Sequence, residues 1–278
     1  MTRRIGRISG VFAVAAALVL FGASAAYAGR ISINSGAEFA LEEDEAIARV
    51  WVQNDGDEAA RDVQPTAEYF GRSSVGPKWA TLAPKERQTH VFSLGDPPAL
   101  PGSYPFVMTI DFADLNQYPL TATNVMAMQA GPSGGRPGIF AKADAVTLKK
   151  SGTMTVALKN EDNVDKAVRA RVLGPRELAV VPREFDLALV ANGQAQQQLA
   201  IDNFSALPGS TYPIFVVFEY DLSGFHYTFV SVTQAAVGAG GMSPGARRNV
   251  IALAGIAFAA VLALEIARRV RTAKKRRR

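Results

Sequence analysis

The stretch ALPGSYPFVMTIDFADL, residues 99–115, has a close copy, ALPGSTYPIFVVFEYDL, at residues 206–222. At the same offset of about 107 residues, Leu82 matches Leu189, so the likeness extends beyond the two stretches. Two long copies indicate a duplicated domain rather than a solenoid, which needs more and shorter repeats.

Each copy contains short runs rich in β-branched and aromatic residues and bounded by Asn, Asp and Gly turns, which predict strands. In the first copy the expected strands are 46–53, 61–69, 88–94 and 106–112, and in the second they are 153–159, 167–173, 196–201 and 214–220. Roughly seven strands in a hundred-residue unit are typical of an immunoglobulin-like β-sandwich. The expected fold is therefore all-β: two tandem immunoglobulin-like β-sandwiches, followed by one C-terminal transmembrane α-helix.

Within the repeated stretch, Leu-Pro-Gly predicts a turn, because proline fixes φ and glycine adopts conformations that other residues resist. The Tyr-Pro that follows predicts the start of a core strand, paired through a hairpin with the last strand of its copy. The motif thus marks a corner of the fold and not an active site.

The order of segments resembles a known family. In each copy a strand ends in Asn-Asp-Gly (54–56) or Asn-Glu-Asp (160–162), then comes LxPxxxxxH from Leu82 or LVANGQAQQ from Leu189, and then LPGSY or LPGSTYP. This order resembles the bacterial and archaeal extracellular Ig-like modules of the CARDB and NEW3 type, over about 200 residues of turn and core positions. The resemblance implies the same fold and a non-catalytic role, since modules of that family mostly serve as adhesion, spacer or carbohydrate-associated domains.

The two ends of the chain predict export and anchoring. Residues 1–28 combine basic residues, an apolar run and a small-residue exit, as in a cleaved signal peptide; the alternative is an uncleaved anchor. Residues 249–267 are long and apolar enough to span a bilayer. The tail 268–278 carries eight basic residues, which predicts a cytoplasmic tail and an exported middle region.

Between these ends we expect sandwiches at 29–130 and 139–237. The segments 131–138 and 238–248 are rich in Gly and Pro, and we interpret them as linkers that allow the sandwiches to reorient.

Composition narrows the function classes. The chain's net charge of +5 includes three basic residues in the signal peptide and eight in the tail, so the segment between them carries −6. That balance disfavours nucleic-acid binding, which needs a basic face. With no cysteine, neither a disulfide framework nor a thiolate metal site can form.

Catalytic chemistry is not expected. The two histidines, His90 and His226, fall at different places in the two copies and have no nucleophile or carboxylate at a recognised spacing. Acidic turns can hold Ca²⁺, but neither turn matches the spaced Ca²⁺ loop, so we expect no metal and no cofactor.

The expected binding residues are acidic loops at the ends of the sandwiches, because such loops are polar and held by a rigid scaffold. They are Asp55, Asp57, Glu58, Glu161, Asp162 and Asp165. A further candidate is Trp79, whose neighbours suggest an exposed aromatic that could stack on a sugar ring, whereas Trp51 lies in an apolar strand and is predicted to be core.

Together these observations predict a membrane-anchored, non-catalytic interaction or scaffold protein of a prokaryotic cell envelope, with an envelope protein as partner. Alternatives are a glycan-binding or adhesin-like accessory protein, a substrate of a sortase-like anchoring system, and, least favoured, a hydrolase. The sortase alternative lacks an LPxTG-like motif before the apolar segment.

Overall fold

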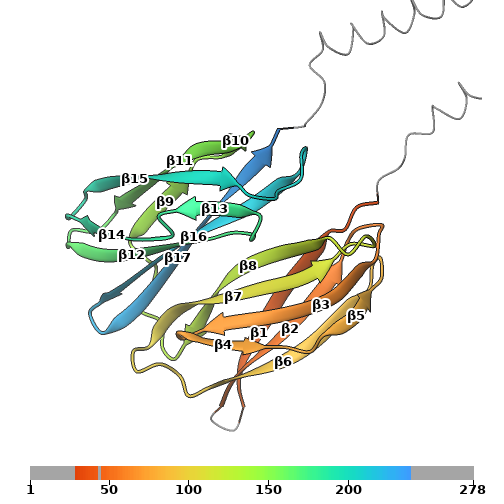
Figure 1. The fold of residues 1–278 in the computed structure, drawn as a ribbon. Helices are drawn as coiled ribbons and strands as arrows, with labels where there is room; N and C mark the ends of the chain where they lie inside the picture. Colours follow the sequence, from red (N-terminus) through yellow and green to blue (C-terminus); the bar gives the residue numbers. More distant parts are fainter. Residues whose placement is uncertain (1–28, 43–44, 239–278) are drawn as a thin grey trace, which may run out of the picture.

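The computed structural model describes residues 29–42 and 45–238, and its regular elements are all β-strands. Figure 1 shows two β-sandwiches in sequence order, as the sequence predicts. The described residues contain no helix that could cross a membrane. The expected signal peptide, the anchor 249–267, the basic tail and all of the second linker after Gly238 lie outside the described residues.

The first sandwich packs two sheets around one apolar core, which includes Leu82, Phe106 and Met108. One sheet has the order β1-β2-β6, with β1 Ile33–Glu42, β2 Glu45–Asn54 and β6 Arg87–Gly95. The other sheet contains β3 Ala60–Tyr69, β4 Arg72–Val75, β5 Trp79–Leu82, β7 Gly102–Ala113 and β8 Pro119–Ala130.

The second sandwich repeats this plan around its own core, which includes Met154, Leu199 and Phe218. One sheet has the order β13-β15-β11-β9, with β9 Ile139–Ala143, β11 Ser151–Asn160, β13 Leu178–Val181 and β15 Gln194–Asn203. The other contains β10 Val146–Leu148, β12 Lys166–Leu173, β14 Glu184–Leu189, β16 Thr211–Leu222 and β17 Phe225–Val237.

The repeated stretch forms β7 in the first copy and β16 in the second. Each begins a hairpin with the next strand, as expected. The β16–β17 turn is tight: Ser223 and Gly224 have φ values of 53° and 78°, which suits a two-residue hairpin connection.

β7 and β16 are buried on both faces. In each strand alternate residues face the core of their own sandwich. The residues between them, Val107 of β7 and Phe215 and Val217 of β16, pack with Val125 of β8 in a separate apolar cluster between the sandwiches. This explains why both strands are almost continuously apolar, since a strand with one wet face would alternate.

The sandwiches are also joined by backbone pairing. Gly102 of β7 pairs with His226 of β17 in parallel register, so strands of both halves belong to one ten-stranded sheet. The amide of His226 donates to the carbonyl of Pro101 at 2.9 Å, and the hydroxyl of Thr228 donates to the carbonyl of Ser103 at 2.7 Å. These contacts fix the two sandwiches against each other.

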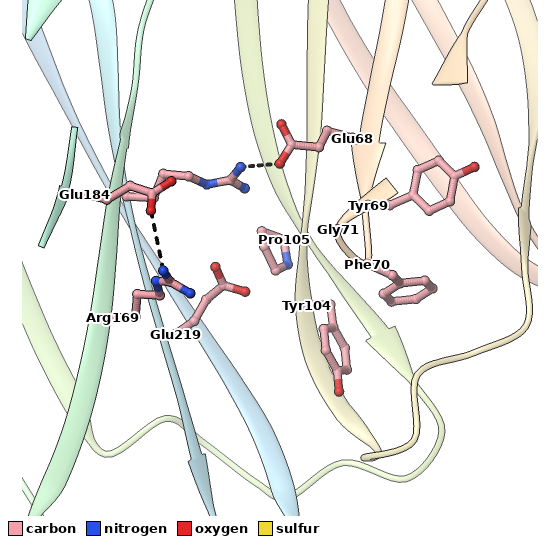
Figure 2. A pocket seen from close by; sticks show the side chains of 10 residues that line it. Glu68, Tyr69, Phe70, Gly71, Tyr104, Pro105, Arg169, Glu184 and Glu219 are labelled. Carbon is pink, nitrogen blue, oxygen red and sulfur yellow. Dashed lines mark hydrogen bonds and ion pairs between the residues drawn. The ribbon is translucent and has the colours of Figure 1, made fainter. Parts of the chain in front are cut away.

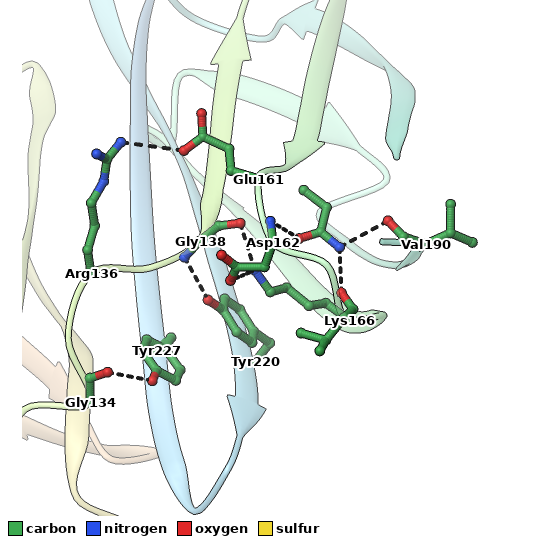
Figure 3. A network of polar contacts seen from close by, with 11 residues as sticks. Gly134, Arg136, Gly138, Glu161, Asp162, Lys166, Val190, Tyr220 and Tyr227 are labelled. Carbon is green, nitrogen blue, oxygen red and sulfur yellow. Dashed lines mark hydrogen bonds and ion pairs between the residues drawn. The ribbon is translucent and has the colours of Figure 1, made fainter. Parts of the chain in front are cut away.

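The segment 131–138 is not the free hinge that its composition predicts. The hydroxyl of Tyr227 donates to the carbonyl of Gly134 at 2.8 Å, and the amide of Gly138 donates to the hydroxyl of Tyr220 at 3.2 Å. Arg136 lies 3.4 Å from Glu161 (Figure 3). Glycine-rich chain can approach a strand surface closely, and here it is bound along the second sandwich.

Candidate binding site between the sandwiches

The two acidic turns are organised by equivalent buried asparagines. Asn54 is fully buried, and its Nδ2 donates to the carbonyls of Glu58 and Leu82 at 2.7 and 3.1 Å. Asn160 is its equivalent in the second copy and makes two bonds of the same kind, at 2.7 and 3.0 Å. Hydrogen bonds from a buried side chain to these backbone carbonyls fix the shape of each turn.

The acidic side chains of the first turn are engaged within the protein. Asp55 accepts a hydrogen bond from the amide of the Gln53 side chain at 2.7 Å, and Asp57 accepts one from the backbone N–H of Arg30 at 2.6 Å. Glu58 lines a groove that lies between the sandwiches. Two of these three carboxylates therefore serve the turn itself.

In the second turn the carboxylates also have internal partners (Figure 3). Asp162 lies 2.6 Å from Nζ of Lys166, whose side chain is fully buried, and Glu161 lies 3.4 Å from Arg136. Asp165 accepts a hydrogen bond from a backbone N–H at 2.8 Å. A charge reversal at Asp162 would leave a buried ammonium unpaired, so it would destabilise the fold as well as change the surface.

The two turns do not form one surface. Glu58 lines a groove together with Thr211, where β16 begins, whereas Asp162 lies near Gly138, which binds Tyr220 close to the end of β16. A strand of this length spans about 36 Å. The predicted loop set is thus split between opposite ends of the molecule.

The tryptophans differ from expectation. Trp79 is half-buried and packs against the core of the first sandwich, so it is not the open platform that a sugar ring would need. Trp51 is not a core residue: it lies on the outer face of β2, against Gly36, with the guanidinium of Arg87 4.3 Å from its ring centroid. Strand alternation explains this, because the neighbours of Trp51 point inward.

His226 lies at the interface. Its Nδ1 is 2.7 Å from Asp221, its Nε2 is 3.2 Å from Glu219, and its ring stacks on Tyr104 at 4.1 Å between centroids. Burial lowers the pKa of His226, but the bonds and charges of the two carboxylates outweigh it, so the pKa lies above its ordinary value. His90 instead packs edge-on against Phe92 in β6.

Figure 2 shows a charged cleft, about 370 Å³ in volume, whose lining includes Tyr104 and Glu219, two of the residues that contact the ring of His226. Arg171 of the second sandwich is paired with Glu68 of the first, and Arg169 lies 3.6 Å from Glu184. These cations already have carboxylate partners, and the Arg171–Glu68 pair links the two sandwiches. The cleft therefore serves to join the sandwiches and is not an open binding site.

A second hollow, which we call the interdomain groove, has a volume of about 760 Å³. Its walls are residues 29–33 and parts of β7 and β8 from the first sandwich, and residues 207–213 from the second. Its charged lining residues are Arg30, Glu58, Asp114 and Glu177. Three carboxylates and one guanidinium give the groove an acidic character.

Glu177 is the unusual residue of this groove. It is 4% exposed, and its Oε1 accepts a hydrogen bond from the amide of Thr121 at 3.3 Å, while its buried Oε2 has no partner among the described residues. Burial raises the pKa of this carboxyl, against the opposing effects of its backbone bonds and of Arg176. Buried side-chain oxygens in native structures nearly always have a hydrogen-bond partner, so an unpaired one calls for an explanation.

Exposed apolar side chains lie near the groove. Leu207 lines it and is 41% exposed, Leu115 at the β7–β8 turn is 55% exposed, and Phe204 is 84% exposed. Phe204 precedes Ser205, whose carbonyl accepts a hydrogen bond from Tyr118 across the interface at 2.8 Å. Exposed aromatic and aliphatic residues around a hollow are typical of protein-binding surfaces.

Sequence reasoning missed this site. Glu177 stands in an ordinary stretch, GPREL, with no motif around it. One signal was available, because the apolar runs 106–110, interrupted only by Thr109, and 214–218 indicate strands covered on both faces and hence an interface. Within the described residues no cluster of His, Asp and Glu is placed to hold a metal ion.

Comparison with known proteins adds only remote likenesses. No family model matches the chain and no curated protein matches it, so the resemblance to CARDB and NEW3 modules stays a prediction. The structure is similar to alpha-2-macroglobulin of Escherichia coli, with a TM-score of 0.33 and 8% identity over 74% of this chain and 17% of that one. It is similar to the E. coli chaperone DraB (TM-score 0.26, 18% identity, 37% of this chain and 55% of that one).

A third likeness is to a protein of unknown function from Porphyromonas gingivalis W83, with a TM-score of 0.30 and 11% identity over 73% of this chain and 99% of that one. The chain spans about 17% of the macroglobulin's length. Likenesses at these TM-scores carry no conclusion about what the chain does.

Proposed function

We propose that the chain is a non-catalytic binding protein of a prokaryotic cell envelope. In this proposal the exported region 29–238 acts as one rigid two-sandwich unit, the segment 249–267 anchors it in the membrane, and an envelope protein is its partner. The observation that carries the proposal is the interdomain groove, a hollow that neither sandwich could form alone.

The interface supports a single rigid unit. An apolar cluster, one backbone pair and hydrogen bonds from both sandwiches hold the groove walls in fixed positions. A preorganised surface loses little conformational freedom on binding, which favours recognition. The exposed apolar residues near the hollow suit contact with a protein, and the acidic groups in it favour a partner of complementary charge.

The positions of the ends support a tether. The described chain begins and ends on the same side of the molecule (Figure 1), and Gly209 of the groove donates to the carbonyl of Val237 at 3.0 Å. A membrane anchor after residue 248 would thus hold the groove near the membrane surface, where an envelope protein could reach it.

The binding role can be tested by photocrosslinking in native membranes. A photoreactive phenylalanine analogue replaces Phe204, and in a matched variant it replaces Phe140, a 51% exposed aromatic of β9. We expect one reproducible protein adduct from position 204 and none from 140. Absence of an adduct at 204, or turnover of an envelope polymer by the purified chain, would count against the proposal.

The topology has its own test. A reporter fused after Arg278 is expected to be cytoplasmic, because eight basic residues in the tail resist translocation. Protease added to intact spheroplasts should digest the sandwiches and spare the tail. Protection of the sandwiches would contradict an exported region.

A further inference from the structure

We propose that the interdomain groove receives a basic side chain, arginine or lysine, from the partner protein, and that Glu177 is its counter-ion. This inference rests on the proposed function and names the chemistry of the partner's contact. It follows from the unpaired carboxylate oxygen, the charge of the groove, and the apolar residues near it.

The buried carboxylate of Glu177 lacks a hydrogen-bond donor for one of its two oxygens. Oε1 accepts a hydrogen bond from the amide of Thr121 at 3.3 Å, whereas Oε2 has no hydrogen-bond partner among the described residues. A buried acceptor left unpaired loses the hydrogen bonds that water would give it, and this loss is greater when the acceptor is charged. The terminal torsion of a glutamate side chain is soft, so either oxygen can turn toward a donor in the groove.

The charge of Arg176 acts on Glu177, but Arg176 does not supply the missing hydrogen bond. Arg176 precedes Glu177 in the chain, but its guanidinium lies 3.0 Å from Asp111, and its side chain is 74% exposed. The remaining lining charges are Arg30 against Glu58 and Asp114. The groove therefore retains an excess of negative charge, which complements a basic group and repels an acidic one.

Apolar residues in and beside the groove indicate which kind of residue should flank the basic residue of the partner. Leu207 lines the groove, and the 84% exposed ring of Phe204 lies three residues before it. Tyr212 also lines the groove, and its hydroxyl accepts a hydrogen bond from the amide of Leu207 at 3.0 Å. A basic residue followed by an aliphatic one would place its charge near Glu177 and its apolar neighbour against this wall.

The test uses the full chain in detergent and two labelled peptides, acetyl-Gly-Arg-Leu-Gly-amide and its analogue with citrulline in place of arginine. Citrulline keeps the shape and removes the charge. By fluorescence anisotropy we expect the arginine peptide to bind at least tenfold more tightly, a difference of about 1.4 kcal/mol. In Glu177→Gln this ratio should fall below twofold, and in Glu38→Gln, an exposed carboxylate of β1, it should persist.

Several outcomes would overturn the inference. Equal binding of the two peptides by the unaltered chain would do so without any variant, which matters if Glu177→Gln fails to fold. A preference that survives Glu177→Gln would do so too. If the arginine peptide is preferred only after Arg247 and Arg248 are both changed to alanine, the groove binds the chain's own segment 238–248 and not a partner. If crosslinking at position 204 succeeds while the peptides bind equally, the proposed function stands and this inference fails.

Discussion

Gly102 and Gly209 occupy the same place in the two copies of Leu-Pro-Gly, yet the structure uses them for different purposes. Gly209 has φ +83° in a turn, and a Cβ added there would meet nothing within 4 Å. Gly102 has φ +147°, and an added Cβ would lie 2.0 Å from the backbone oxygen of His226. One copy kept a turn residue, whereas in the other the same residue became the contact point for the neighbouring sandwich.

Replacing each glycine with alanine tests this difference and should give the largest effect. Gly102→Ala should lower the free energy of unfolding by about 4 kcal/mol, because backbone strain adds to a clash with backbone atoms that cannot move aside. Gly209→Ala should cost only about 1 kcal/mol, from backbone strain alone. Urea unfolding of the two variants measures the difference, and equal losses would show that position 102 is an ordinary turn.

Where the copies kept the same role, their variants should behave alike. Asn54→Ala and Asn160→Ala each remove a buried amide that makes at least three hydrogen bonds to the backbone of its turn and neighbouring loop, so each should destabilise the chain by about 3 kcal/mol. Asn163, an exposed residue of the second turn, is the matched control, and its change to alanine should stay within about 0.5 kcal/mol. A large inequality between the two buried asparagines would mean that only one turn is structural.

A substitution in the apolar cluster between the sandwiches should cause a smaller loss of unfolding free energy. Val217→Ala removes two methyl groups from the cluster between the sandwiches and should cost about 2 kcal/mol. The unaltered chain should unfold in a single calorimetric transition. In the variant the weaker contact between the sandwiches should separate this into two transitions. Val232→Ala on β17, where the side chain is 58% exposed, should leave a single transition. A single transition in both variants would argue against separate cores coupled by this cluster.

The smallest expected effect is on the pH dependence of stability. It involves Glu177 and His226, which lie at different places along the interface. The pKa of Glu177 is raised by burial, so its neutral form favours the folded state, and stability falls as pH rises above about 4.5 through the folded pKa. The pKa of His226 is raised by Glu219 and Asp221 despite burial. The stability that His226 contributes is therefore fully present below about pH 6.5, and it is lost as pH rises through the folded pKa.

Melting temperature measured from pH 4 to 9 should decline in two steps. Glu177→Gln should remove the lower step and His226→Gln the upper one. A melting temperature that rises across either window would contradict the sign of the corresponding shift.

Eight strands could be predicted from local pattern, because apolar and β-branched residues run between turn residues there; the expected 106–112 and 214–220 fall inside β7 and β16. Short strands such as β4, Arg72–Val75, lack that pattern and were not expected. What the second face of those strands contacts could not be predicted, since Val107 and Val217 meet only through tertiary packing. Trp51 shows a related limit: an apolar strand does not say which of its residues points outward.

The candidate site was still harder to predict. Glu177 acquires its burial from residues far away in sequence, such as Thr121, and nothing in GPREL signals it. The acidic turns were visible in the sequence, but carboxylates are equally used to cap turns and to neutralise buried lysine, as Asp57 and Asp162 are. Composition alone cannot separate these uses.

The bonds between the end of β17 and the groove wall have a mechanical consequence. Gly209 donates to the carbonyl of Val237 at 3.0 Å, and the amide of Val237 donates to the carbonyl of Ser210 at 2.8 Å. A partner that pulls on residues 207–213, the part of the groove wall from the second sandwich, would pass its load to residue 238 through these two bonds. The force would bypass the core of the first sandwich and the segment 131–138, so a strained complex would keep both sandwiches folded until this short link gave way.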